Sequence, residues 1–224
     1  MTTAPRSIAM IHTVAGLTPV FDALLRSELV GWQGFNMVDE SLLRATVADG
    51  SPSAMTHRRL GALIGSAVDA GAQAVVVTCS SLGSAVEAAR PFCPVPLFRI
   101  DQGMAESAVR SSRRIGVLAT LPSTLRPTGD LIRATSDRLG RDCVVIDRLS
   151  EGAFQKLAAG DTAGHDAMVA AHLRQLVKEV DVVVLAQASM ARALAAVSDE
   201  LGGTPVLTSP ELGIRHIKDS LANL

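Results

Sequence analysis

The sequence has no tyrosine, one tryptophan and only 3% aromatic residues, so its composition says little about the shape of a substrate. It also lacks an excess of either charge, because 21 Lys and Arg residues stand against 22 Asp and Glu residues, for a formal net charge of −1. A chain without a basic surplus has no electrostatic footprint for nucleic acid or for anionic membrane surfaces. We therefore expect no nucleic-acid partner and no membrane partner, and a small molecule as the substrate.

Long apolar runs and a secretory leader are missing as well. Hydrophobic residues make up 48% of the chain, but no run approaches the ~18 residues that indicate a membrane span. The first residues, MTTAPRSIAMIHTV, contain neither the apolar core nor the small-residue cleavage site of a signal peptide. We expect a soluble, cytoplasmic protein.

Cysteine is scarce and widely spaced. The three residues Cys79, Cys93 and Cys143 are an odd number and form no Cys-x-x-Cys pair, which fits neither a disulfide framework nor a metal site. No stretch resembles a dinucleotide fingerprint or a Walker loop. We expect neither a metal nor a nucleotide cofactor, and any role for a thiol must be individual.

Apolar, β-branched segments alternate with Ala-rich segments that carry apolar residues at helical spacing. This alternation predicts an α/β architecture with parallel sheets. The expected strands are Ser7–Ile11, Gly34–Val38, Ala74–Thr78, Val95–Arg99, Arg114–Ala119, Cys143–Asp147, Asp181–Ala186 and Pro205–Thr208. The expected crossover helices include Met55–Ala70, Gly103–Ser111, Leu125–Leu139 and Gly164–Glu179.

The chain contains an internal repeat. The segment SIAMIHTVAGLTPVFDALL, which starts at Ser7, matches RIGVLATLPSTLRPTGDLI, which starts at Arg114; both read strand, threonine, loop, Leu-x-Pro, helix. An offset of 108 residues carries AVVVTCSS onto VVVLAQAS, so that Cys79 corresponds to Gln187. We therefore expect two pseudo-symmetric Rossmann-like domains, with an active-site cleft between them where the strand ends converge.

The last strand and the final helix follow the second repeat, so the chain is expected to cross back and complete the first half. The expected domains are residues 1–98 with 208–224, and residues 99–207.

Cys79 directly follows the valine-rich strand 74–78, in the segment VVVTCSSLG. Ligands in open α/β sheets bind beyond the carboxyl ends of such strands, where the amides of the next helix and neighbouring hydroxyls can favour a thiolate. Cys79 is thus a candidate nucleophile or carbon-acid base, the alternative being a small buried apolar residue. For Cys93 and Cys143 we expect structural roles.

Two clusters of hydroxyls follow related strands, and His12 ends the first strand. Side chains and amides at such positions can hold a carboxylate, although Ser and Thr also serve as ordinary helix caps and a strand-end histidine is often structural. The candidate binding residues are His12, Ser80, Ser81, Thr120, Ser123 and Thr124.

Together, the segments VVVTCSS, RIGVLATLPSTL and VVVLAQASMA resemble the aspartate/glutamate/hydantoin racemase superfamily over nearly the whole chain. The resemblance implies two pseudo-symmetric α/β domains and catalysis without metal or pyridoxal phosphate. In the racemases of that superfamily, a cysteine follows a strand in each half, and the two thiols act on opposite faces of a substrate α-carbon. Cys79 matches the first thiol, whereas Gln187 stands where the second is expected.

A glutamine amide cannot act as an acid or base near neutral pH, but it can donate hydrogen bonds to an anionic oxygen. Two-thiol racemisation is therefore in question, and would need His12 or a bound water in place of the missing thiol. The resemblance implies a cofactor-independent isomerase acting at the carbon next to a carboxylate of a small acid or amino acid, with Cys79 as thiol base or nucleophile. Gln187, Ala188 and Ser189 would supply donors.

Two alternatives remain open: a single-thiol decarboxylase of a malonate-like acid, and a non-catalytic carboxylate-binding protein. Arylmalonate decarboxylases in the superfamily also use one thiol, but on the other side, whereas the position of Cys79 agrees with the nucleophile of maleate isomerases. Kinship further suggests a homo-oligomer, without indicating its interface.

Overall fold

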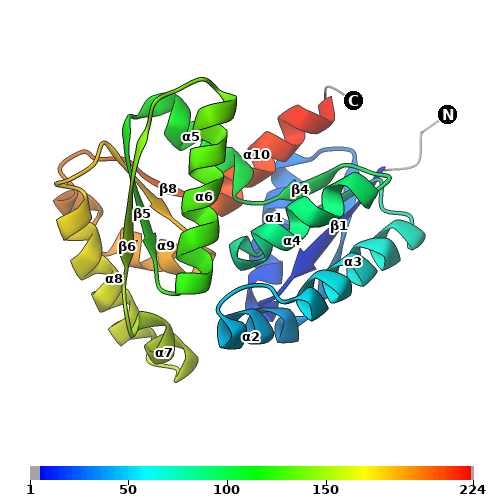
Figure 1. Ribbon diagram of the computed structural model, residues 1–224, viewed down its shortest axis with the longest axis horizontal. Coiled ribbons are helices and arrows are strands. Elements are labelled where there is room, and N and C mark those ends of the chain that lie inside the picture. The colour runs from blue at the N-terminus through cyan, green and yellow to red at the C-terminus, as the bar shows by residue number, and fades with distance from the viewer. Residues whose placement is uncertain (1–5, 223–224) are drawn as a thin grey trace. The chain divides into compact units, whose positions relative to one another are not determined.

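The computed structural model describes residues 6–222. The chain divides into two compact units (Figure 1): the first runs to Gly103 and resumes at Pro210, and the second comprises Met104–Ser209. Each unit has one four-stranded sheet in which all neighbouring strands are parallel. The α/β fold expected from the sequence is confirmed.

The first sheet has the strand order β2-β1-β3-β4. Its elements, in chain order, are β1 (Arg6–His12), η1 (Ala15–Leu17), α1 (Thr18–Glu28), β2 (Trp32–Val38), α2 (Glu40–Asp49), α3 (Ala54–Asp69), β3 (Ala74–Val77), η2 (Ser80–Leu82), α4 (Gly83–Ala89), η3 (Arg90–Phe92) and β4 (Leu97–Arg99), with α5 (Gln102–Ser111) leading into the second unit.

The second sheet has the corresponding order β6-β5-β7-β8. Its elements are β5 (Arg114–Ala119), α6 (Pro122–Arg138), β6 (Val144–Leu149), α7 (Ala153–Ala158), α8 (Thr162–Leu176), β7 (Val182–Leu185), η4 (Ala188–Met190), α9 (Ala191–Ala195), η5 (Ser198–Glu200) and β8 (Val206–Thr208), followed by α10 (Ser209–Ala222). Both units thus repeat the same strand order, which confirms the internal repeat.

The chain crosses back only after its last strand. The strand β8 does not return to the first half; it pairs with β7 as the edge of the second sheet, in the place that β4 occupies in the first. Only α10 returns, because its apolar residues Ile214, Ile217 and Leu221 pack in the core of the first unit. The repeat therefore supplies four strands to each sheet, and the final helix is an addition to it.

Both faces of the first sheet are covered, and the alternation along β1 shows how. Ile8 and Met10 pack with residues of α1 and α10. Ala9 and Ile11 pack on the opposite face with residues of α2, α3 and α4. All four residues of β3 are fully buried, as a central parallel strand requires.

The helix after β5 begins earlier than the sequence predicted. We expected it from Leu125 on, but α6 starts at Pro122, and Pro127 lies inside it. Proline suits the first helical position because its missing N–H has no intrahelical partner there. As a result, Ser123 and Thr124 belong to the first turn of α6 rather than to a loop.

Within the described residues, no helix is both long enough and apolar enough to cross a membrane.

Candidate functional site

The turn that carries Cys79 lies at the carboxyl edge of the first sheet, directly after β3. Cys79 has extended backbone angles, and the next three residues form η2, which leads into α4. The thiol is half-buried. It accepts hydrogen bonds from the Thr13 side chain and from the backbone amides of Ser81 and Leu82. The sulfur therefore lies where three donors converge.

These donors do not make Cys79 a resting thiolate. Burial raises the pKa of the Cys79 thiol, and the carboxylate of Asp101 raises it further, whereas the three hydrogen bonds lower it. Burial outweighs the donors, so the pKa is raised overall and the sulfur carries its proton near neutral pH. The sequence suggested that amides and hydroxyls would favour the thiolate; they do so, but against a larger cost of desolvation.

In the second unit, Gln187 occupies the equivalent place after β7. Its Oε1 accepts a hydrogen bond from the backbone N–H of Thr120 at 2.7 Å and one from the Thr120 hydroxyl at 3.0 Å. Because a backbone N–H can only donate, the amide oxygen must face Thr120. The amide nitrogen of Gln187 then has two N–H groups, and within the described chain neither has an acceptor. Gln187 is half-buried and presents donors only.

The same threonine contact occurs in both units. Thr13 donates to the sulfur of Cys79, and Thr120 donates to the amide oxygen of Gln187. The strand register explains why. Ile11 pairs with Val77 in the first sheet, and Leu118 pairs with Leu185 in the second. Two residues beyond each pair, the threonine lies beside Cys79 or Gln187. The repeat thus extends to the contacts of the site. The sequence aligned Thr13 with Thr120, but we did not select Thr13 as a site residue.

The remaining predicted binding residues cluster around these two turns. In the first unit, Ser80 and Ser81 are buried in η2. In the second, Ser123 and Thr124 are buried in the first turn of α6, and the hydroxyl of Ser123 has no hydrogen-bond partner. A buried hydroxyl without a partner is costly, and the N-terminus of a helix is a favourable place to bind an anion. Ala188 and Ser189 are half-buried in η4, directly after Gln187.

His12 is fully buried, and both of its ring nitrogens are occupied. Nε2 lies 2.9 Å from Oδ1 of Asn36, whose Nδ2 donates to Asp22 at 2.9 Å. The Asn36 oxygen must therefore face the ring, so Nε2 carries the hydrogen and Nδ1 accepts from the hydroxyl of Thr78 at 2.9 Å. His12 has no free atom for a substrate in this arrangement. It positions Thr78, the residue before Cys79.

The burial of His12 predicts a loss of stability in acid. Burial lowers the pKa of His12 below its usual value, although the contacts with Asn36 and Asp22 oppose this. The unfolded chain therefore binds a proton that the folded chain excludes, and stability must fall as the pH drops through the unfolded pKa of about 6.5. We expect the unfolding free energy to decrease more between about pH 8 and about pH 5.5 in the wild type than in His12→Gln. Urea titrations at both pH values measure this, and equal decreases would contradict it.

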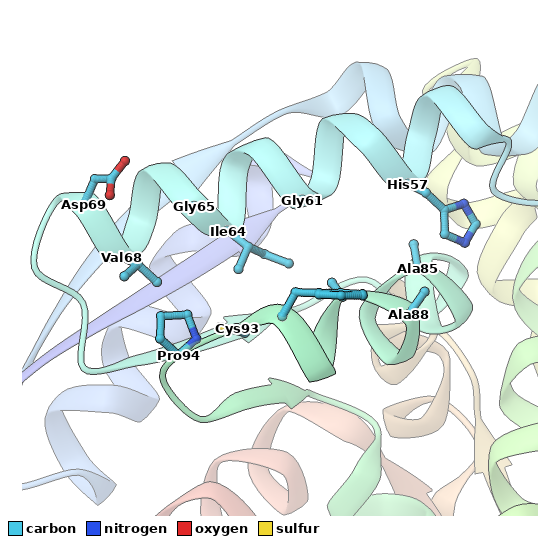
Figure 2. A pocket seen from close by; sticks show the side chains of 12 residues that line it. His57, Gly61, Ile64, Gly65, Val68, Asp69, Ala85, Ala88, Cys93 and Pro94 are labelled. Atoms are coloured by element: carbon cyan, nitrogen blue, oxygen red, sulfur yellow. The ribbon is translucent and has the colours of Figure 1, made fainter.

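A groove of about 410 Å³ lies elsewhere in the first unit (Figure 2). The side chain of Val68 points from α3 towards Pro94, whereas Ala85 and Ala88 lie at the other end of the groove, near His57. None of the predicted site residues lines this groove. Its rim includes Phe92, which is 87% exposed, so the groove is an apolar surface feature distinct from the Cys79 turn.

No cluster of three or more His, Cys, Asp or Glu side chains that could hold a metal ion occurs in the described residues 6–222.

Comparison with known proteins agrees with these observations. The fold resembles glutamate racemase from Bacillus anthracis (18% identity, 99% of this chain and 83% of that one, TM-score 0.74). It also resembles allantoin racemase from Klebsiella pneumoniae (17%, 97% and 88%, TM-score 0.70) and an aspartate racemase homologue from Pyrococcus horikoshii (16%, 98% and 100%, TM-score 0.65). Comparison with curated protein sequences gives no match. The sequence model of the Asp/Glu/Hydantoin racemase family matches residues 11–217, and the chain belongs to this family.

Proposed function

We propose that the protein is a racemase-type isomerase that works without a cofactor at the carbon next to a carboxylate of a small acid or amino acid. Family membership supports an isomerase of the racemase type. The observation that carries the assignment to Cys79 is the convergence of Thr13 and two backbone amides on its sulfur at the carboxyl edge of the first sheet. These donors can stabilise negative charge on sulfur at the moment it forms.

In the proposed reaction, Cys79 acts on one face of the substrate carbon. Once the Cys79 thiol has lost its proton to water, the thiolate can remove the hydrogen next to the carboxylate, which returns the thiol and leaves an enolate-like anion. The serines of η2, Ser80 and Ser81, are assigned to substrate carboxylate oxygens. Ser123 and Thr124 are assigned in the same way, and Ser123 brings its unpartnered hydroxyl. Thr120, whose N–H and hydroxyl both donate to Gln187, is assigned to hold the Gln187 amide in place.

Gln187 is assigned to hold a substrate oxygen rather than to move a proton. Its oxygen is engaged with Thr120, and its two N–H groups suit an anionic acceptor. The neighbouring residues Ala188 and Ser189 supply further donors. Proton transfer then differs between the two faces of the carbon. The Cys79 thiol exchanges a proton at one face, and inversion needs water to supply a proton at the other. His12, the other substitute considered, has both ring nitrogens occupied.

The protonated state of Cys79 favours a second candidate, decarboxylation of a malonate-like acid. There, carbon dioxide leaves first, and the resulting carbanion takes the proton of the Cys79 thiol. A raised thiol pKa suits a proton donor better than a base. Water then returns a proton to the Cys79 thiolate, so one thiol is sufficient for turnover.

The experiment that tests the proposal is an NMR survey in D₂O of α-amino acids, hydantoins, malonates and maleate with the wild-type chain. Exchange of the substrate α-hydrogen, or conversion of maleate, supports the isomerase. Loss of a carboxylate supports the second candidate. A silent panel in which small dicarboxylates nevertheless slow alkylation of Cys79 would replace both with a carboxylate-binding protein.

Gln187→Glu tests the assignment of Gln187. A glutamate can still accept both hydrogen bonds from Thr120, so the local structure should persist, but it cannot donate and adds a negative charge. The loss of a hydrogen bond to a charged group is worth about 1.5–3 kcal/mol, so we expect kcat/KM to fall at least ~10–100-fold with an almost unchanged Tm. Steady-state kinetics and thermal melts measure this. An active Gln187→Glu would remove Gln187 from the site.

A further inference from the structure

Asp101 lies beside Cys79 at the carboxyl edge of the first sheet, and sequence reasoning did not select it. Val77 of β3 pairs with Ile11 of β1 and with Arg99 of β4. Two residues beyond these partners the three chains reach Thr13, Cys79 and Asp101. Thr13 donates to the sulfur, and the Asp101 carboxylate, which is fully buried, acts on the sulfur through its charge.

A buried arginine holds Asp101 in place. Arg99 donates from Nε to Oδ1 at 3.0 Å and from Nη2 to Oδ2 at 2.9 Å, and both residues are almost inaccessible to solvent. Such a two-pronged geometry is the one in which a buried ion pair offsets the cost of leaving water. Glu87 on α4 adds a second carboxylate 3.9 Å from the guanidinium.

The same guanidinium lies against the start of α4. A Cβ placed on Gly83, the first residue of α4, would come within 2.5 Å of the Arg99 guanidinium carbon, so only glycine permits this approach. Gly83 directly follows η2, whose amides at Ser81 and Leu82 donate to the sulfur of Cys79. The ion pair therefore supports the turn that presents the thiol.

We propose that the buried Arg99–Asp101 pair is a positioning device for Cys79, in which Asp101 holds the Arg99 guanidinium in place and Arg99 supports the turn that presents the thiol. Its importance for catalysis rests on the proposed function, but the coupling between the pair and the thiol does not. Neither residue is assigned a contact with substrate, so both are positioning residues.

The charges around the thiol determine in which direction each substitution should move the pKa of Cys79. Asp101 raises the pKa of Cys79. Arg99 partly neutralises Asp101 and is itself approached by Glu87. On the β1 side, burial lowers the pKa of His12 and keeps it neutral. Glu40 of α2 accepts a hydrogen bond from the Ala15 amide, beyond Thr13. Removing Asp101 should therefore lower the pKa of Cys79, and removing Arg99 should raise it.

The test is the pH profile of Cys79 alkylation by iodoacetamide in the full chain, followed by peptide mass spectrometry with Cys93 and Cys143 as internal references. For Asp101→Asn we expect the midpoint to fall by about one pH unit, which makes alkylation at a fixed lower pH ~10-fold faster. For Arg99→Gln we expect a midpoint that is higher by a similar amount. The matched control Asp69→Asn, an exposed aspartate on α3, should leave the midpoint unchanged.

Opposite shifts cannot come from a general loss of structure, which would move both variants the same way. Shifts of equal sign, or unmoved midpoints in folded variants, would overturn the proposal. If either single variant fails to fold, the double variant Arg99→Gln/Asp101→Asn leaves no buried charge unpaired. Because the two shifts oppose each other, its midpoint must lie between those expected for the two single variants, and a midpoint outside that interval would overturn the proposal. Alkylation needs no substrate, so a silent substrate survey with shifted midpoints would refute the proposed function alone.

Discussion

Cys79→Ala is expected to lose at least ~10²–10⁴-fold in turnover on any substrate that the wild type converts, the range typical for removing a positioned acid or base. The reason is that Gln187, its counterpart in the second unit, cannot exchange protons near neutral pH. The fold should survive, because Cys79 is only half-buried and alanine fits the extended backbone at this position. The measurement is the initial rate by NMR, with thermal melts to confirm folding.

Cys93→Ala is the matched control, since Cys93 is also a half-buried free thiol of the first unit. It lines the groove beside α3 rather than the carboxyl edge of the sheet. We expect Cys93→Ala to keep the wild-type rate. If both variants lose activity equally, or if Cys79→Ala retains it, Cys79 is not the reacting thiol.

Gly213→Ala is expected to destabilise the first unit by about 3 kcal/mol, the upper part of the usual range for overpacking, which would lower Tm by roughly 6–12 °C. Gly213 lies inside α10, and an added Cβ would strike the carbonyl oxygen of Ile100 and come within 2.7 Å of its Cδ1. Backbone atoms cannot rotate away as a flexible side chain can. The substitution therefore tests whether α10 completes the first core, and thermal unfolding measures it.

Gly61→Ala is the control for this change. Gly61 also lies inside a helix of the first unit, α3, but nothing lies within 4 Å of the position its Cβ would take. Alanine is favoured over glycine in helices by about 0.8–1 kcal/mol, so Gly61→Ala should raise Tm slightly. A Gly213→Ala variant as stable as Gly61→Ala would mean that α10 does not pack against the residues after β4 as described.

The strands were predictable because the sequence of a buried parallel strand is a short, continuous apolar run. The block Ala74–Val77, for example, has no competing helical period and forms β3. The repeat then fixed the correspondence of Cys79 with Gln187. The start of α6 was not predictable, because Pro122 and Pro127 are each compatible with a proline near a helix start.

The contacts of the site were less predictable, because they depend on which side chains meet across strands. Thr13 appeared in the repeat, and its alignment with Thr120 was a usable signal. Asp101 follows an apolar strand as Cys79 does, but a single aspartate after a strand is common at turns. The register of β1 places His12 between Asn36 and Thr78, and this register cannot be read from the sequence.

The most direct test of the central claim, that one thiol serves one face of the substrate carbon, is α-hydrogen exchange in D₂O measured separately for the two enantiomers of the first substrate found. The account predicts unequal rates: one enantiomer exchanges rapidly, the other much more slowly, and the rapid exchange disappears in Cys79→Ala. Equal exchange of both enantiomers that persists in Cys79→Ala would contradict it.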